Sequence, residues 1–155
     1  MLKSIESLSD DSRVFIYPGS RKFYPQELPV IREKLEEFCQ SLEGVELAFE
    51  IKYDRFLVFV VADRTPLDLD QQNILVDFVQ GLENEFSIVL LDKVNVCFKQ
   101  GEYVQLKEVK DFKKLIKNKG VSKNTIVFDL LINTKDEYEQ FFEVPAQDSW
   151  VSHFF

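Results

Sequence analysis

Residues 56–62 read FLVFVVA, an uninterrupted apolar run of aromatic and β-branched side chains. Such a run is typical of a strand that is buried on both faces. The preceding segment, residues 45–53, alternates apolar and polar side chains, which predicts a half-buried strand. Asp54 and Arg55 form the turn between the two, so residues 45–62 are expected to form two consecutive strands.

One helix is predicted before this pair of strands in the sequence and another after it. Residues 25–42 carry apolar side chains at helical spacing and follow a first strand at 13–17. A second helix is expected around residues 75–86, with Asp68 or Asp70 available to cap its start. With a fourth strand at 93–99, residues 1–100 read strand, helix, strand, strand, helix, strand. This order predicts an α+β fold with a ferredoxin-like βαββαβ core.

The remaining residues, 101–155, predict a C-terminal β-α-β-α elaboration. Its strands are expected at 103–106 and 125–128, and its helices over the lysine-rich segment before Gly120 and at 134–142. The two helices of a ferredoxin-like core cover only one face of its sheet. Because the run at 56–62 needs burial on both faces, we expect residues 101–155 to cover the second face and residues 1–155 to form a single domain.

Charge is unevenly distributed along this acidic chain. The net charge is −8, yet residues 107–123 hold seven lysines against two acidic residues, a local charge of +5 that leaves −13 for the rest. An acidic body disfavours nucleic acid and anionic lipid as partners. Cys39 and Cys97 are far apart in the sequence and each lies in an apolar pattern, which is typical of buried thiols in a reducing compartment. No apolar run is long enough to span a bilayer. A cytoplasmic protein without membrane contact is predicted.

No residue pattern of a known catalytic centre is present. The five glycines are too scattered for a phosphate-binding loop, and the single histidine, His153, lies beside Ser149 in the tail, whereas catalytic triads are assembled from distant segments. Asp63, Asp68 and Asp70 lack the spacing of a calcium loop. We therefore predict no catalytic, cofactor-binding or metal-binding residues and no cofactor.

Two alternatives stay open at this point. One is a small-molecule enzyme that uses carboxylates in the loop around Asp63 and Asp68. The other, less favoured, is an RNA-binding ferredoxin-like domain, because residues 14–17 and 55–60 occupy the positions where RNA-recognition modules carry their stacking motifs. The glycines that let bases approach those motifs are absent here.

The preferred interpretation is a non-catalytic binding module. Its lysine-rich helix presents several cations on one face, and its tail holds the aromatic residues Phe141, Phe142, Trp150, Phe154 and Phe155, which either pack on the body or form an interface. An acidic protein or a second copy of the chain would fit such a surface. The candidate interaction residues are Lys110, Lys113, Lys114, Lys117, Trp150, His153 and Phe154.

Several segments resemble a small family of uncharacterised bacterial proteins that carry the label "ABC transporter ATPase". They are RVFIY at 13–17, FEIKYDRF at 49–56, LDKVNV at 91–96, DFKK at 111–114, VSKNTIVF at 121–128 and VPAQDSW at 144–150. The label implies ATP hydrolysis, but this chain has no Walker A motif, so ATPase activity is not expected and we regard the label as a misnomer.

The chain also departs from the family at two places that could carry chemistry. Family members carry a Gly-Cys-Ser-x-Asp run at the start of the second helix and a histidine directly after the terminal tryptophan. Here the first stretch reads LDQQN at 69–73, and Val151 follows Trp150. Thiol–imidazole chemistry, if the family performs it, is therefore not expected of this chain.

Overall fold

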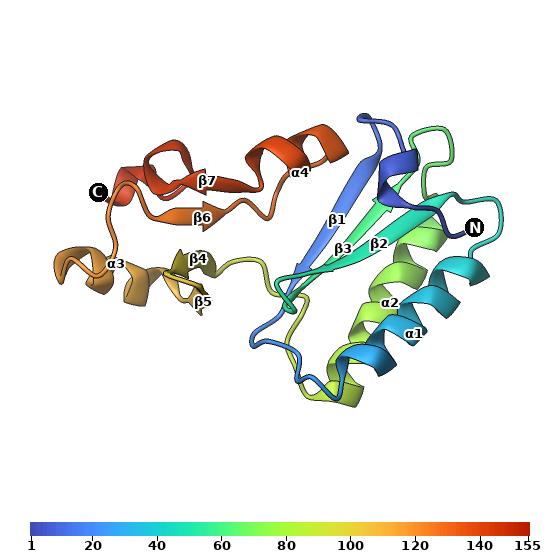
Figure 1. Cartoon of the computed structure of the whole chain (residues 1–155), viewed down its shortest axis with the longest axis horizontal. Helices are drawn as coiled ribbons and strands as arrows, with labels where there is room; N and C mark the ends of the chain where they lie inside the picture. The colour runs from blue at the N-terminus through green and yellow to red at the C-terminus, as the bar shows by residue number, and fades with distance from the viewer. The chain divides into compact units, whose positions relative to one another are not determined.

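The computed structural model describes all of residues 1–155 and contains four α-helices and two antiparallel sheets (Figure 1). This confirms the α+β fold class. The chain forms two compact units. The first consists of Met1–Asp92 with Asn133–Asp136, and the second of Lys93–Ile132 with Glu137–Phe155. The interpretation of residues 1–155 as a single domain stays a prediction, because it concerns how the two units associate.

The first unit is a three-stranded sheet with two helices on one of its faces (Figure 1). The strand order is β1-β3-β2, with the register Phe15↔Phe59 on one side of β3 and Phe49↔Phe59 on the other. Its elements are η1 (Ile5–Ser7), β1 (Arg13–Pro18), α1 (Leu28–Ser41), β2 (Leu47–Lys52), β3 (Phe56–Val61) and α2 (Leu69–Phe86).

The core of the first unit lies between this sheet and the two helices. Alternate residues of β3, namely Leu57, Phe59 and Val61, pack against buried residues of α1 and α2. The Phe59 ring is fully buried and meets two other rings edge to face, with centroid distances of 6.0 Å to Tyr17 and 6.2 Å to Phe38. All six residues of β3 are buried, as the apolar run predicts.

Short backbone segments line both edges of the three-stranded sheet. Leu2 forms a parallel bridge to Leu47 at the β2 edge, and the amide of Val14 on the β1 edge donates to the carbonyl of Asn133 at 2.9 Å. The Met1 ammonium group donates to carbonyls at the end of α1 and beyond it, those of Cys39 (3.5 Å), Leu42 (3.3 Å) and Val45. A cation at this end complements the helix dipole.

The second unit is a four-stranded sheet of order β5-β4-β6-β7. A hairpin joins β4 and β5 through a turn in which Gly101 adopts the left-handed conformation, with φ of +62°. Its elements are β4 (Val96–Gln100), β5 (Tyr103–Lys107), α3 (Val109–Lys117), β6 (Ile126–Phe128), α4 (Lys135–Phe141, which begins in the first unit), β7 (Glu143–Pro145), η2 (Ala146–Asp148) and η3 (Ser152–Phe154).

The predicted ferredoxin-like core is wrong in its fourth strand. The βαββα part forms as expected, but β4 pairs with β5 and β6 in the second sheet and not with β1. The edge of β1 that a fourth strand would use is occupied by Asn133 and Thr134. The coverage of the second face of the first sheet by residues 101–155 stays a prediction, although Asn133–Asp136 of that segment does join the first unit.

Both cysteines are buried and neither forms a disulfide, which confirms their assignment as buried thiols. Burial raises the pKa of the Cys39 thiol to about 12, so this group stays protonated and unreactive at neutral pH. No helix combines the length and the apolar character that crossing a bilayer requires.

Candidate interaction surface

The helix α3 presents a row of lysines on its outer face. Phe112, on the opposite face, is fully buried and packs edge to face on Phe98 of β4, with ring centroids 5.1 Å apart. This contact fixes the rotation of the helix about its own axis. The lysines, at positions i, i+3, i+4 and i+7, therefore share one exposed face, and they are Lys110, Lys113, Lys114 and Lys117.

The C-terminal tail packs beside this helix through two neighbouring contacts. Phe112 on the inner side of α3 meets the Phe155 ring edge to face at 6.4 Å. On the outer side, the Lys113 ammonium lies 4.6 Å from the centroid of the Phe154 ring, within the range of a cation–π contact. Phe154 and Phe155 are partly buried and pack against the hydrophobic core of the second unit, so this part of the tail packs on the body.

Two further side chains of the tail surround Phe154. The Trp150 ring stands edge to face with it at 6.0 Å, and the His153 ring is tilted against it at 4.2 Å. Trp150 stays 43% exposed, and His153 is exposed as well. The seven candidate residues therefore form one continuous patch, which we call the α3–tail surface: Lys110, Lys113, Lys114, Lys117, Trp150, His153 and Phe154.

Little within the chain neutralises the positive charge of this surface. Lys110 lies 3.5 Å from Glu108, and Lys114 lies 3.9 Å from Asp111, while both lysine side chains are more than 70% exposed. Ion pairs this exposed contribute little to stability and exchange readily for pairs with a partner. Lys117 has no ion pair in the structure. The surface thus offers cations and aromatic rings together.

The tail histidine lacks the partners of a catalytic triad. The Ser149 hydroxyl donates to the carbonyl of Ala146 at 2.8 Å and accepts from the amide of Val151 at 3.2 Å. Both contacts belong to the turn that ends η2. The His153 ring packs against the ring of Phe154, which supplies no proton acceptor.

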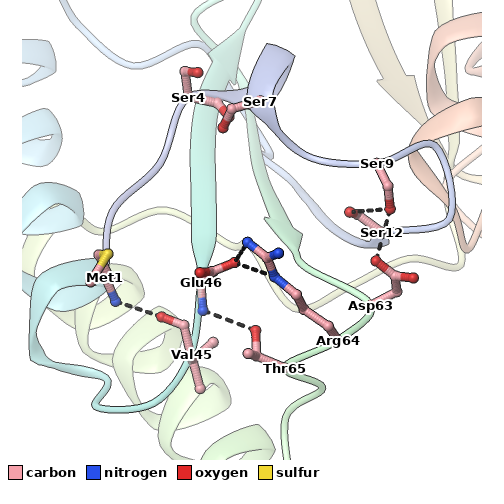
Figure 2. A network of polar contacts seen from close by, with 10 residues as sticks. All are labelled: Met1, Ser4, Ser7, Ser9, Ser12, Val45, Glu46, Asp63, Arg64 and Thr65. Carbon is pink, nitrogen blue, oxygen red and sulfur yellow. Dashed lines mark hydrogen bonds and ion pairs between the residues drawn. The ribbon is translucent and has the colours of Figure 1, made fainter.

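The carboxylates of the loop after β3 hold the backbone in place. Asp63 accepts a hydrogen bond of 2.8 Å from the Ser9 hydroxyl, which also lies 3.5 Å from the hydroxyl of Ser12 (Figure 2). A hollow of about 230 Å³ lies beside this loop. Neither Asp63 nor Asp68 lines it; its polar lining comes from Arg13 and Gln72. Neither carboxylate therefore faces this hollow.

Asp68, one of the two residues that the sequence offers as a cap, is the N-cap of α2. Its carboxylate accepts from the amide of Gln71 at 2.8 Å, and the Gln71 side chain accepts from the amide of Asp68 at 3.0 Å, which completes a capping box. We expect Asp68→Ala to lower the free energy of unfolding by about 1 kcal/mol, because the amide of Gln71 loses its partner. Urea denaturation measures this loss. An equal loss in Asp77→Ala, an exposed position within the same helix, would contradict a specific capping role.

Of the aromatic rings in the two segments that an RNA-recognition module would use for stacking, Tyr17, Phe56 and Phe59 are buried and Phe15 is partly buried. Phe59 and Tyr17 pack against each other in the core of the first unit, with exposed fractions of 0% and 6%. Burial raises the pKa of the Tyr17 hydroxyl to about 12. Because base stacking requires an exposed ring face, these residues offer no stacking platform.

A hollow beside two helices is not predicted by the sequence pattern. It lies between α1 and α2 in the first unit, has a volume of about 500 Å³, and includes Phe38 and Phe78 in its lining. Helical spacing assigns both residues to the core, and it gives no sign that the helices leave a groove beside them. Gly81 is the only local signal, since a glycine within a helix often has a packing reason.

No group of three or more histidine, cysteine, aspartate or glutamate side chains lies close enough to hold a metal ion. Comparison of the chain with family models, with curated proteins and with solved structures gives no match. The resemblance to the family labelled "ABC transporter ATPase" therefore stays a prediction, and the assignment of a function depends on the α3–tail surface itself.

Proposed function

We propose that this protein is a non-catalytic binding module that captures an acidic protein segment on its α3–tail surface. The observation that carries the proposal is the contact between Lys113 and Phe154, because it joins the lysine row and the exposed aromatic tail into one patch. Lysines attract and orient an acidic segment, and an exposed tryptophan provides the apolar anchor that binding surfaces commonly use.

The charge distribution supports this choice of partner. Residues 107–123 carry a local charge of +5 in a chain of net charge −8, so an acidic segment is attracted to this region and repelled elsewhere. The same distribution argues against nucleic acid, whose backbone would meet an acidic surface outside this short region. A carboxylate-rich segment with one or two apolar side chains fits both the lysines and the aromatic rings of the surface.

The proposal can be tested through the fluorescence of Trp150, the only tryptophan in the chain. The probe is a synthetic peptide of alternating Glu and Leu residues, titrated into the full chain at low ionic strength. Binding is expected to shift the tryptophan emission. The shift should weaken at an ionic strength of about 0.15 M, where the Debye length is about 8 Å. Lys113→Glu/Lys117→Glu should reduce the affinity by about tenfold or more.

A matched control separates this surface from overall charge. Lys22→Glu/Arg32→Glu makes the same change of net charge at two exposed positions of the first unit. It should leave the affinity for the acidic peptide within about twofold of the unchanged chain, because neither residue belongs to the α3–tail surface. Equal losses in both double variants, or no binding by the unchanged chain, would refute the proposal.

A further inference from the structure

The groove between α1 and α2 has an apolar floor. Phe38 and Phe78 stack face to face, with ring centroids 4.2 Å apart and an interplanar angle of 14°, and Leu82 lies buried next to them. Gly81 also lines the groove, and a Cβ atom placed there would meet no atom within 4 Å, so the space above this residue is open. The volume of about 500 Å³ is large enough for an aromatic side chain.

The rim of the groove and the helices around it are acidic. Glu37 and Glu85 line the groove, and Lys34 forms an ion pair of 3.2 Å with Glu85. The first unit as a whole has 10 Lys and Arg against 19 Asp and Glu, a net charge of −9. The helices α1 and α2 together contain two basic residues, Arg32 and Lys34. They contain seven acidic residues: Glu33, Glu36, Glu37, Asp70, Asp77, Glu83 and Glu85.

We propose that this groove receives the α3–tail surface of a second copy of the chain. Trp150 supplies an exposed indole for the apolar floor, and Lys113 and Lys117 supply cations for the acidic rim. The indole ring and the floor of the groove are both apolar, and the charges around the ring are opposite in sign to those around the groove. The inference rests on the proposed function, since it uses the same α3–tail surface and identifies the acidic partner as the helical layer of another copy.

This association joins two different surfaces, so it is heterologous. Each copy carries one groove and one α3–tail surface, and after one contact forms, each partner keeps one unused surface. The assembly therefore grows with protein concentration until rotation between copies closes a ring. Salt should weaken it, because exposed charges contribute to the contact.

The experiment measures the mass of the full chain by light scattering over a series of concentrations. The unchanged chain is expected to increase in mass with concentration. Gly81→Leu should stay monomeric, because the new side chain fills the groove. It should also keep its melting temperature, since leucine is a better helix former than glycine and the site is open. Gln80→Leu adds the same side chain at an exposed neighbouring position and should assemble like the unchanged chain.

Charge complementarity provides a second readout. Glu37→Lys and Lys113→Glu should each weaken the association, and an equimolar mixture of the two variants should recover a two-chain species. In the mixture, the unchanged α3–tail surface of the first variant meets the unchanged groove of the second. Recovery in the mixture distinguishes a direct contact from misfolding of either variant.

Three results would overturn this inference: a monomer at every concentration, assembly that Gly81→Leu leaves intact, or a mixture that recovers nothing. None of them decides the proposed function, which depends on the acidic peptide. Gly81→Leu should still bind that peptide, because its α3–tail surface is unchanged. Peptide binding by a chain that stays monomeric would support an acidic partner of another kind.

Discussion

Replacing Phe59 with alanine is expected to lower the free energy of unfolding by about 3–5 kcal/mol, the typical cost of removing a fully buried aromatic ring. Phe59 is 0% exposed and lies opposite Phe15 and Phe49 at the centre of the three-stranded sheet. Its removal leaves a cavity bordered by Tyr17 and Phe38, and their edge-to-face contacts with it are lost. Urea denaturation followed by circular dichroism measures the change.

The matched control for this variant is Phe141→Ala. Phe141 is 51% exposed, so its truncation should change the free energy of unfolding by no more than about 0.5 kcal/mol. Similar losses in the two variants would contradict the position of Phe59 at the centre of the core. A variant of Phe59 that no longer unfolds cooperatively would agree with the larger expected effect.

Gly19→Ala is expected to destabilise the protein by about 1–3 kcal/mol, although it adds a single methyl group. A Cβ atom at residue 19 would lie 2.7 Å from the carbonyl oxygen of Arg21 and 2.8 Å from that of Arg55. Both neighbours are backbone atoms, which cannot rotate away. The Gly19 amide also donates to the Arg55 carbonyl at 2.9 Å, and the buried Arg55 side chain donates back to the Gly19 carbonyl at 2.8 Å. Displacing this backbone disturbs both hydrogen bonds.

Gly81→Ala is the control for this effect, because it makes the same chemical change in open space. A Cβ at residue 81 meets nothing within 4 Å, and the residue lies inside α2. Alanine should therefore raise the free energy of unfolding by about 0.5–1 kcal/mol through its higher helix propensity. Opposite signs at residues 19 and 81 would confirm that close backbone contact accounts for the cost. A gain in stability at Gly19 would contradict it.

Local patterns predict the elements of this chain well. The apolar run at 56–62 becomes β3, the helical spacing at 25–42 contains α1, and Asp68, one of the two predicted candidates, caps α2. These features depend on neighbours in the sequence. The partner of β4 is decided differently, by a tight turn that pairs it with β5 and by residues 133–134, which occupy the β1 edge. Periodicity shows which face of a strand is buried, but not which strand lies beside it.

The sequence likewise predicts the local part of the candidate surface but not the contacts between distant segments. The lysine row is visible in the sequence because helical spacing fixes which side chains share a face. The contact of Lys113 with Phe154 cannot be predicted from the sequence, because the two residues are far apart in the chain and are brought together by the packing of Phe112 on Phe155. The α1/α2 groove depends on the distance between two helices, which no residue pattern in either helix specifies.

The backbone segment at Asn133–Thr134 also has a consequence for synthesis on the ribosome. The rest of the first unit is complete at Asp92, and a nascent chain elongates at about 5–20 residues per second, so the 42 residues from Lys93 to Thr134 take roughly 2–8 s. During that interval the β1 edge lacks its partners at Arg13 and Val14, and an open strand edge is a template for aggregation. Faster translation of this segment, or a chaperone that holds the nascent sheet, would raise the yield of folded protein.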